Sequence, residues 1–396
     1  MMPRGMTGRA AAVLAAGFLV LFVAGGSRLA IGLTLKPMAD DLGWTRGTLG
    51  LAAAAFFAVS AICMFVSGRL ADRFSLRLIL GGGLAASALG IGLMGTVTAP
   101  WQAFLLYGGV FAVGSGVASV VPVSVMVSRW FPGRTGIAAS ATISGISVGQ
   151  LVMIALMTVV LVEVGWRSVY VWLGITNLVL IPIVLLAIAH DRDHQTATAT
   201  AQPATGLRIG EAARTRRFWL LAAVYSICGV QDFFVATHVV AFAQDRGVEA
   251  LFAGNLLALM GLTGLMGVIV AGVWSDRKGP MWPTLACFVI RIAVFALILV
   301  DQDTPAVAAF ALLYGSTFLV TAPLAVIFIR EAFGQTHLGA LTGLLTMIHH
   351  VSGGIGAYGG AALFDAEGSY DTAFAVMLVL SLVAAALSFA LRGPRG

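Results

Sequence analysis

Twelve long apolar stretches divide this chain and constrain its fold more than any other feature. A helix that crosses a bilayer needs about 20 mostly apolar residues, and breaks of charge, Pro, Gly and Trp separate segments of that length. The predicted spans are 10–35, 47–68, 78–98, 101–127, 136–162, 166–189, 217–242, 250–273, 282–300, 306–329, 338–363 and 372–391. The sequence therefore predicts an all-α membrane protein with twelve transmembrane helices.

Charged residues are too scarce for a water-soluble protein. They form 10% of the 396 residues, and mean hydropathy is +0.98, whereas a soluble domain carries about 25% charged residues. The three cysteines lie in apolar stretches and are interpreted as small buried side chains. With no nucleophile–base set, metal cluster or phosphate loop in the pattern, we expect neither an enzyme nor a bound cofactor or metal.

The positive charges predict which side of the membrane each loop occupies, because basic residues concentrate in cytoplasmic loops. With both termini in the cytoplasm, the inner segments contain Arg4, Arg9, Arg69, Arg73, Arg77, Arg129, Arg134, Arg192, Arg208, Arg214, Arg216, Arg217, Arg277, Lys278, Arg330, Arg392 and Arg395. The outer loops contain Lys36, Arg46, Arg167 and Arg246. This asymmetry predicts cytoplasmic termini and accounts for the net charge of +6 without a nucleic-acid partner.

A repeat at an offset of about 204 residues indicates two related halves. The segment 68–73 (GRLADR) returns as 272–277 (GVWSDR), and Asp41 returns as Asp245. One long polar stretch separates the two copies. We predict six-helix bundles at 1–189 and 217–396, joined by a cytoplasmic linker at 190–216. Parallel repeats of this kind imply a substrate site between the halves, near the membrane midplane.

The loop after the second span carries a recognisable pattern, Gly68-x-x-x-Asp72-Arg73-x-Ser75-x-Arg77. It resembles the loop 2–3 signature of the major facilitator superfamily, with Ser75 in place of a usual glycine. The resemblance covers nearly the whole chain. It implies two bundles that expose a central site alternately to the two sides of the membrane.

The same resemblance implies gating residues. In that family an Asp–Arg pair latches the cytoplasmic ends of helices, which assigns this role to Asp72, Arg73 and Arg77 and, in the second copy, to Asp276 and Arg277. An ordinary role as cytoplasmic positive charges stays open for Arg73 and Arg77.

Further stretches resemble the oxalate/formate antiporter and monocarboxylate transporter branch of that superfamily. They are 43–46 (GWTR), 129–134 (RWFPGR) and, with similarity to bacterial transporters grouped there, 349–371. Val268 stands where many monocarboxylate carriers have a substrate-binding arginine. The resemblance implies a monomeric secondary transporter of the bacterial inner membrane that moves a small organic anion, a carboxylate, by exchange or with a proton as coupling ion.

Two charged residues inside predicted spans are candidates for the site, because intramembrane charges are expensive and need a partner. Arg28 and Asp232 differ by 204, the offset of the repeat, and therefore occupy equivalent positions on spans one and seven. We predict that they pair in one state, and that in another Arg28 receives an anionic substrate while Asp232 takes or passes a proton. The alternative is a permanent ion pair that fixes packing.

Other polar side chains in the spans are further candidates. His349 and His350 lie mid-span, and because neighbours on a helix point about 100° apart, at most one of them is expected to face the cavity directly. The resemblance favours His349, and a packing role is the alternative. Further substrate or coupling candidates are Arg291, His238, Gln150, Tyr107 and Tyr314. Pro122 and Pro323 are expected to bend spans four and ten.

Two other classes of function remain open. One is a carrier of a non-carboxylate solute, such as a metal, vitamin or drug-like compound, imported or exported. The other is a membrane sensor that binds its ligand without transporting it.

Overall fold

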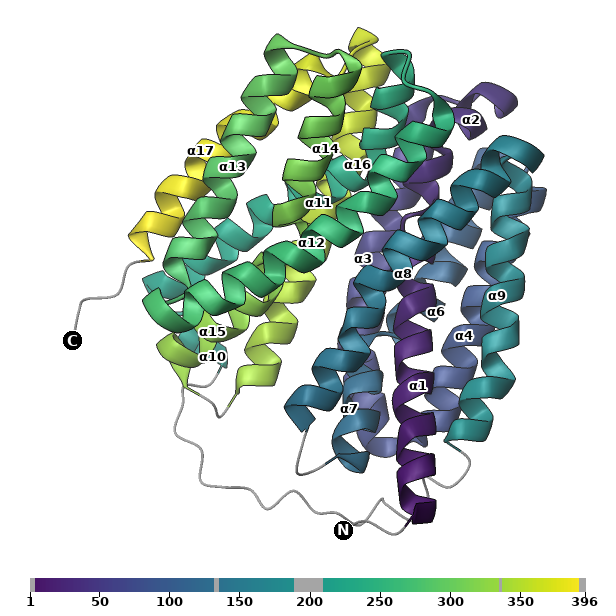
Figure 1. Ribbon diagram of the computed structural model, residues 1–396, viewed down its shortest axis with the longest axis vertical. Helices are drawn as coiled ribbons and strands as arrows, with labels where there is room; N and C mark the ends of the chain where they lie inside the picture. Colours follow the sequence, from purple (N-terminus) through teal and green to yellow (C-terminus); the bar gives the residue numbers. More distant parts are fainter. Residues whose placement is uncertain (1–3, 132–134, 189–208, 335–336, 392–396) are drawn as a thin grey trace. The chain divides into compact units, whose positions relative to one another are not determined.

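The computed structural model describes residues 4–131, 135–188, 209–334 and 337–391, which form helices and no strand (Figure 1). The helices are α1 (Arg4–Ser27), α2 (Ala30–Leu42), α3 (Arg46–Arg73), α4 (Leu76–Leu93), α5 (Pro100–Ala103), α6 (Ala112–Val117), α7 (Val120–Trp130), α8 (Thr135–Val164), α9 (Trp166–Ala187), α10 (Ile209–Ala212), α11 (Arg216–Asp245), α12 (Ala250–Lys278), α13 (Met281–Val300), α14 (Thr304–Phe318), α15 (Thr321–Phe333), α16 (Leu338–Glu367) and α17 (Asp371–Ala390). A 3-10 turn (η1, Met94–Thr96) follows α4, and a π-helical segment (η2, Phe104–Phe111) joins α5 to α6. Within these described residues, twelve segments are long and apolar enough to cross a membrane, which confirms the predicted fold class.

The chain forms two compact units. Unit 1 contains 1–44 and 51–200, and unit 2 contains 45–50 and 201–396. The first turn of α3 therefore belongs to unit 2 and the rest of that helix to unit 1. Most of the predicted linker, 190–208, lies outside the described residues. Its last part contains the short helix α10.

Unit 1 is built on close helix crossings at glycines. α1 packs along α8, and α4 packs along α9. A Cβ added to Gly149 of α8 would meet the Phe22 carbonyl of α1, and one added to Gly25 would meet the Ile146 carbonyl. Between transmembrane helices, where lipid is as apolar as the side chains, such small residues let the backbones approach and gain dispersion contacts.

Unit 2 repeats the same pairing of helices. α11 packs along α16, and α13 packs along α17. A Cβ on Gly229 of α11 would meet the His349 carbonyl of α16, and a Cβ on Gly356 would meet the Val230 carbonyl. The equivalent helices of the two units thus pair in the same way, as expected from a duplicated six-helix sequence.

Three spans are broken rather than continuous. The first span changes from α1 to α2 at Arg28, where the Leu29 N–H bonds to the Gly26 carbonyl instead of continuing the α pattern. The fourth and tenth break shortly before their prolines, with Pro122 in the first turn of α7 and Pro323 in the first turn of α15. Because proline cannot donate a backbone hydrogen bond, it is accommodated at a helix start. At Pro122 and Pro323 the structure therefore has interruptions between two helices, where the sequence predicted bends within one helix.

We expect the α11–α16 crossing to be intolerant of a larger side chain. In Gly356→Val the new methyl groups overlap the α11 backbone, and overpacking of this kind costs about 1–3 kcal/mol. The melting temperature of the purified protein should fall by several degrees. Gly359→Val on the same helix is the matched control, because nothing lies within 4 Å of its Cβ position. Equal melting temperatures for the two variants would contradict the proposed close crossing.

Candidate functional site

Asp232 lies at the centre of a buried polar cluster in unit 2. Its side chain extends from the middle of α11 and is 3% exposed. Oδ1 accepts hydrogen bonds from Arg291 Nη2 at 2.7 Å and from the Tyr314 hydroxyl at 2.9 Å. A carboxylate buried in the middle of a membrane-spanning segment requires this degree of compensation, because an unpaired charge there is costly.

Arg291 of α13 is fully buried, and each of its donors has a partner. Besides Asp232, Nη1 donates to the Gln231 side-chain oxygen at 3.1 Å, and Nε donates to the Thr317 hydroxyl at 3.0 Å. The Gln231 amide in turn donates to Ser381 and to the Met377 carbonyl of α17. The guanidinium thereby holds α11, α13 and α14 in one register. Sequence analysis named Arg291 as a further candidate without a partner, and the structure brings it onto Asp232.

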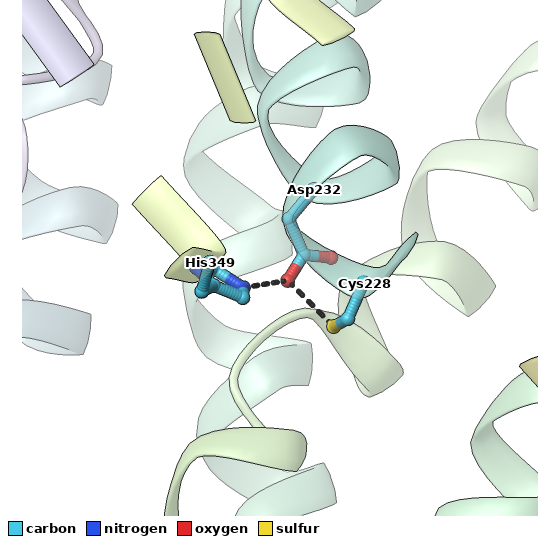
Figure 2. Close-up of side chains that lie close together, drawn as sticks. All are labelled: Cys228, Asp232 and His349. Atoms are coloured by element: carbon cyan, nitrogen blue, oxygen red, sulfur yellow. Dashed lines mark hydrogen bonds and ion pairs between the residues drawn. The ribbon is translucent and has the colours of Figure 1, made fainter. Parts of the chain in front are cut away.

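The second carboxylate oxygen of Asp232 faces two different side chains (Figure 2). The Cys228 thiol, one turn earlier on α11, donates to Oδ2 at 3.2 Å, and His349 Nε2 of α16 lies 3.3 Å from the same atom. His350 turns away and bonds through Nδ1 to the Thr346 carbonyl of its own helix. Of the two neighbouring histidines, the one on the carboxylate is therefore His349.

The cluster is asymmetric in its access. Asp232 and Arg291 are sealed, whereas the His349 side chain is 14% exposed. The Asp–Arg pair is neutral as a unit and buried. The partly exposed imidazole is therefore the group of this cluster that an arriving proton or anion can meet first. Chemically the arrangement can hold a proton, exchange it with the carboxylate, and offer a cation to an anion at the exposed edge of the ring.

Cys228, Asp232 and His349 also offer one possible metal-ligand atom each, all within 4.8 Å of one another. Tetrahedral zinc with these donors needs ligand atoms about 3.3–3.8 Å apart, and Asp232 Oδ2 lies 3.2 Å from the Cys228 sulfur and 3.3 Å from His349 Nε2. However, the Arg291 guanidinium occupies Oδ1 and lies 3.5 Å from the Cys228 sulfur. The guanidinium opposes the double charge of a divalent metal more strongly than the single charge of a proton, so the cluster fits a proton or an anion better than a metal.

Arg28 and Tyr107 meet in unit 1 at the break of the first span. The Tyr107 hydroxyl donates to the Arg28 carbonyl at 2.9 Å, which satisfies a backbone acceptor near the end of α1. Gln150 is fully buried on α8 in the same unit. The predicted pairing of Arg28 with Asp232 joins residues of the two units and stays a prediction. Within unit 2, Asp232 is bound by Arg291.

A second polar cluster of unit 2 involves Arg46 in the first turn of α3. Its guanidinium bonds to both Asp245 oxygens, at 2.6 and 2.8 Å, and donates to the Tyr370 hydroxyl at 2.9 Å. The backbone N–H groups of Arg46 and Gly47 donate to the Asp365 carboxylate. The carboxylate therefore caps the start of α3, where the helix dipole favours negative charge.

His238, a further candidate from the sequence, belongs to this second cluster. Nδ1 lies 3.1 Å from the Tyr370 hydroxyl, and Nε2 lies 2.8 Å from the Ala357 carbonyl. Burial raises the pKa of the Tyr370 phenol, against the opposing effect of Arg46. The protonated phenol can donate to Nδ1 while Nε2–H donates to the carbonyl, so this contact set suits a neutral histidine with a structural role.

Sequence reasoning missed several members of both clusters. Cys228 and Gln231 could have been found by their spacing, one turn before Asp232 and directly beside it. Asp245 was used to define the offset of the repeat, but that offset did not predict its contact with Arg46. Arg46 was counted as an outer-loop charge, although it lies in the GWTR stretch that carried a family resemblance.

Comparison with known proteins decides the family. The family model described as Major Facilitator Superfamily matches residues 17–300 and 233–396. The chain belongs to the major facilitator superfamily. It is 23% identical over 395 residues to the oxalate:formate antiporter of Oxalobacter formigenes, covering 97% of this chain and 92% of that one. It is 26% identical over 308 residues to monocarboxylate transporter 13 of Rattus norvegicus, covering 75% and 69%. Among solved structures it resembles the nucleoside transporter NupG, with a TM-score of 0.79, 14% identity, and coverage of 98% and 100%.

As a member of the major facilitator superfamily, the chain is a multi-pass membrane transporter. Its predicted gating residues lie at helix ends. Asp276 and Arg277 are exposed in the last turn of α12, and Arg77 is exposed near the start of α4. The side chains of Asp72 and Arg73, at the end of α3, are outside the described ones. The latch role of these residues stays a prediction.

We expect the Asp232–Arg291 pair to show strong coupling in stability. Removing one partner leaves an uncompensated buried charge and lowers the free energy of unfolding by about 3–5 kcal/mol. Arg291→Met should therefore lower the melting temperature of the purified protein markedly. Adding Asp232→Asn to it should recover much of the loss, because neither charge then remains. The control is Arg246→Met at the exposed Arg246–Asp371 pair, worth about 0–1 kcal/mol. A double variant no more stable than Arg291→Met alone would argue against the ion pair as the source.

Proposed function

We propose that this transporter carries a small organic anion, a carboxylate, by alternating access, coupled to a proton or by exchange. The names of the oxalate:formate antiporter and of monocarboxylate transporter 13 support the substrate class, since both describe carboxylate carriers. The observation that carries the proposal is the Asp232–Arg291–His349 cluster, a neutral buried ion pair with a partly exposed imidazole on its carboxylate.

The proton has a defined path in this proposal. It enters at the exposed His349 ring and is shared with Asp232 across the 3.3 Å contact. The protonated imidazole then presents positive charge at the site while Arg291 keeps the carboxylate compensated. An anion that arrives with the proton finds a cation, and its departure frees the proton. In exchange mode the proton stays and a second anion replaces the first.

Arg28 supplies the other positive charge. It is half-buried at the junction where α1 ends and α2 begins. The N-terminus of α2 follows directly, and a helix N-terminus inside a membrane favours an anionic group. A broken span with an arginine at the break therefore suits a carboxylate of the substrate, and the Tyr107 hydroxyl holds the backbone of the break in place.

The proposal is tested with purified protein in liposomes. Uptake of radiolabelled formate, lactate and oxalate is measured with an imposed proton gradient and, separately, with unlabelled anion inside. Gradient-driven uptake supports proton coupling, and stimulation only by internal anion supports exchange. Uptake of nucleosides or Zn²⁺ in place of these anions would contradict the assignment, and specific anion binding with no flux would indicate a sensor.

His349 and His350 provide a matched pair for the coupling step. We expect His349→Gln to reduce uptake roughly ten- to a hundredfold, the effect of losing one charge-assisted hydrogen bond of about 1.5–3 kcal/mol. The remaining uptake should lose its dependence on pH, because the glutamine amide does not take up a proton in place of the imidazole. His350→Gln should retain both the rate and the pH profile. Equal effects of the two substitutions would refute the relay.

The role of Arg28 is tested by charge exchange. Arg28→Ala and Asp232→Ala should each abolish coupled uptake, and Arg28→Asp combined with Asp232→Arg tests whether the pair acts as a unit. A single variant that keeps full coupled transport would remove Arg28 or Asp232 from the mechanism. Thermal melting in the presence of substrate distinguishes loss of binding from loss of fold.

We also propose that both termini lie in the cytoplasm of a bacterial inner membrane, with a monomer as the transporting species. The excess of basic residues in the segments of one side supports this orientation. Cysteine substitutions at Gly247 and Gly279, labelled with a membrane-impermeant maleimide in a cysteine-less background, should react from outside and inside the cell respectively.

A further inference from the structure

A cavity of about 270 Å³ opens at the end of unit 2 where α11 begins and α12 ends. Its wall also includes the start of α13 and the end of α15. This volume is below that of drug-binding pockets, which are about 300–1,000 Å³, and suits a headgroup-sized ligand. The cavity shares no lining residue with the Asp232 cluster.

Three charged residues line this cavity: Arg217, Lys278 and Glu331. All three are exposed, and in the described part of the chain none of them makes an ion pair with another or with a third residue. Two cations and one carboxylate thus face one space without neutralising each other. The complementary ligand carries a compact anion and, close to it, a single cation.

The tryptophans around the cavity place it at the headgroup level of the membrane and indicate a lipid as the source of that ligand. Trp282 lines it and is 38% exposed, and Trp219 and Trp274 lie on the neighbouring turns of α11 and α12 with exposed rings. Partly exposed tryptophans mark the headgroup level of a membrane. The rest of the wall is apolar, with Leu221, Phe328 and Leu391 among it, which suits the glycerol and upper acyl carbons of a phospholipid.

We propose that this cavity binds a membrane phospholipid whose headgroup carries a phosphate and a primary ammonium, the phosphoethanolamine type. Arg217 and Lys278 receive the phosphate, as basic pockets between transmembrane helices receive lipid headgroups. Glu331 receives the ammonium. The acyl chains follow the exposed apolar surface of α13, where Val289 is 54% exposed. This site is independent of the transported solute.

The test is native mass spectrometry of the full chain, delipidated in detergent and titrated with phosphatidylethanolamine, phosphatidylglycerol or phosphatidylcholine. Phosphatidylethanolamine should bind most tightly. In Arg217→Gln/Lys278→Gln its affinity should fall about 20- to 30-fold, since each cation near a lipid surface contributes about fivefold. In Glu331→Gln the preference over phosphatidylglycerol should disappear while phosphatidylglycerol binding is retained.

The control is Asp276→Asn/Arg277→Gln, exposed on the same last turn of α12 but outside the cavity wall. It should bind all three lipids as the original chain does. The proposal is overturned if the cavity variants bind phosphatidylethanolamine unchanged, or if Glu331→Gln leaves the lipid preference intact. Displacement of the lipid by millimolar inorganic phosphate would likewise overturn it, because the site would then serve a free anion.

Discussion

The buried ion pair of Asp232 and Arg291 is the interaction on which the rest of unit 2 depends. Moving either charge alone into a low-dielectric membrane interior costs several kcal/mol, and pairing repays this only when the remaining donors and acceptors also have partners. Gln231, Thr317 and Tyr314 supply those partners from α11 and α14. The pair can therefore form only when these helices and α13 meet in one arrangement, which makes the polar cluster a constraint on packing as well as a site.

The glycine crossings explain why His349 reaches that pair. At Gly229 the backbone of α11 touches the His349 carbonyl of α16, with no Cβ between them. Asp232 lies about one helical turn after Gly229 on α11, where its carboxylate contacts both the Cys228 thiol and the His349 imidazole. A larger residue at the crossing would separate the two helices and lengthen this contact. The small residue at the crossing thus determines whether the imidazole and the carboxylate can come into contact.

The duplicated sequence has kept its packing and changed its chemistry. Both units pair the same equivalent helices, and the equivalent spans four and ten both break shortly before Pro122 and Pro323. At equivalent positions, however, the first copy has Arg28 and the second has Asp232. The arginine lies at a break in its span, while the aspartate lies in a continuous helix. The duplicated scaffold thus carries opposite charges at equivalent sequence positions, and the proposed function assigns an anion to the first and a proton to the second.

The sequence by itself determined the twelve spans, the repeat and the depth of the charged residues. The length of an apolar stretch and the position of a charge within it can be read directly from the sequence, and the thickness of the bilayer relates both to membrane-spanning helices. Asp232 and His349 were therefore found as candidates. The partner of Asp232 was decided only by tertiary structure, because that depends on the rotation of each helix, and one residue of difference turns a side chain by about 100°. For the same reason the contact of His349 with Asp232, the place of Cys228 and the Arg46–Asp245 contact followed only once the helices had packed, although the family resemblance already favoured His349 over His350.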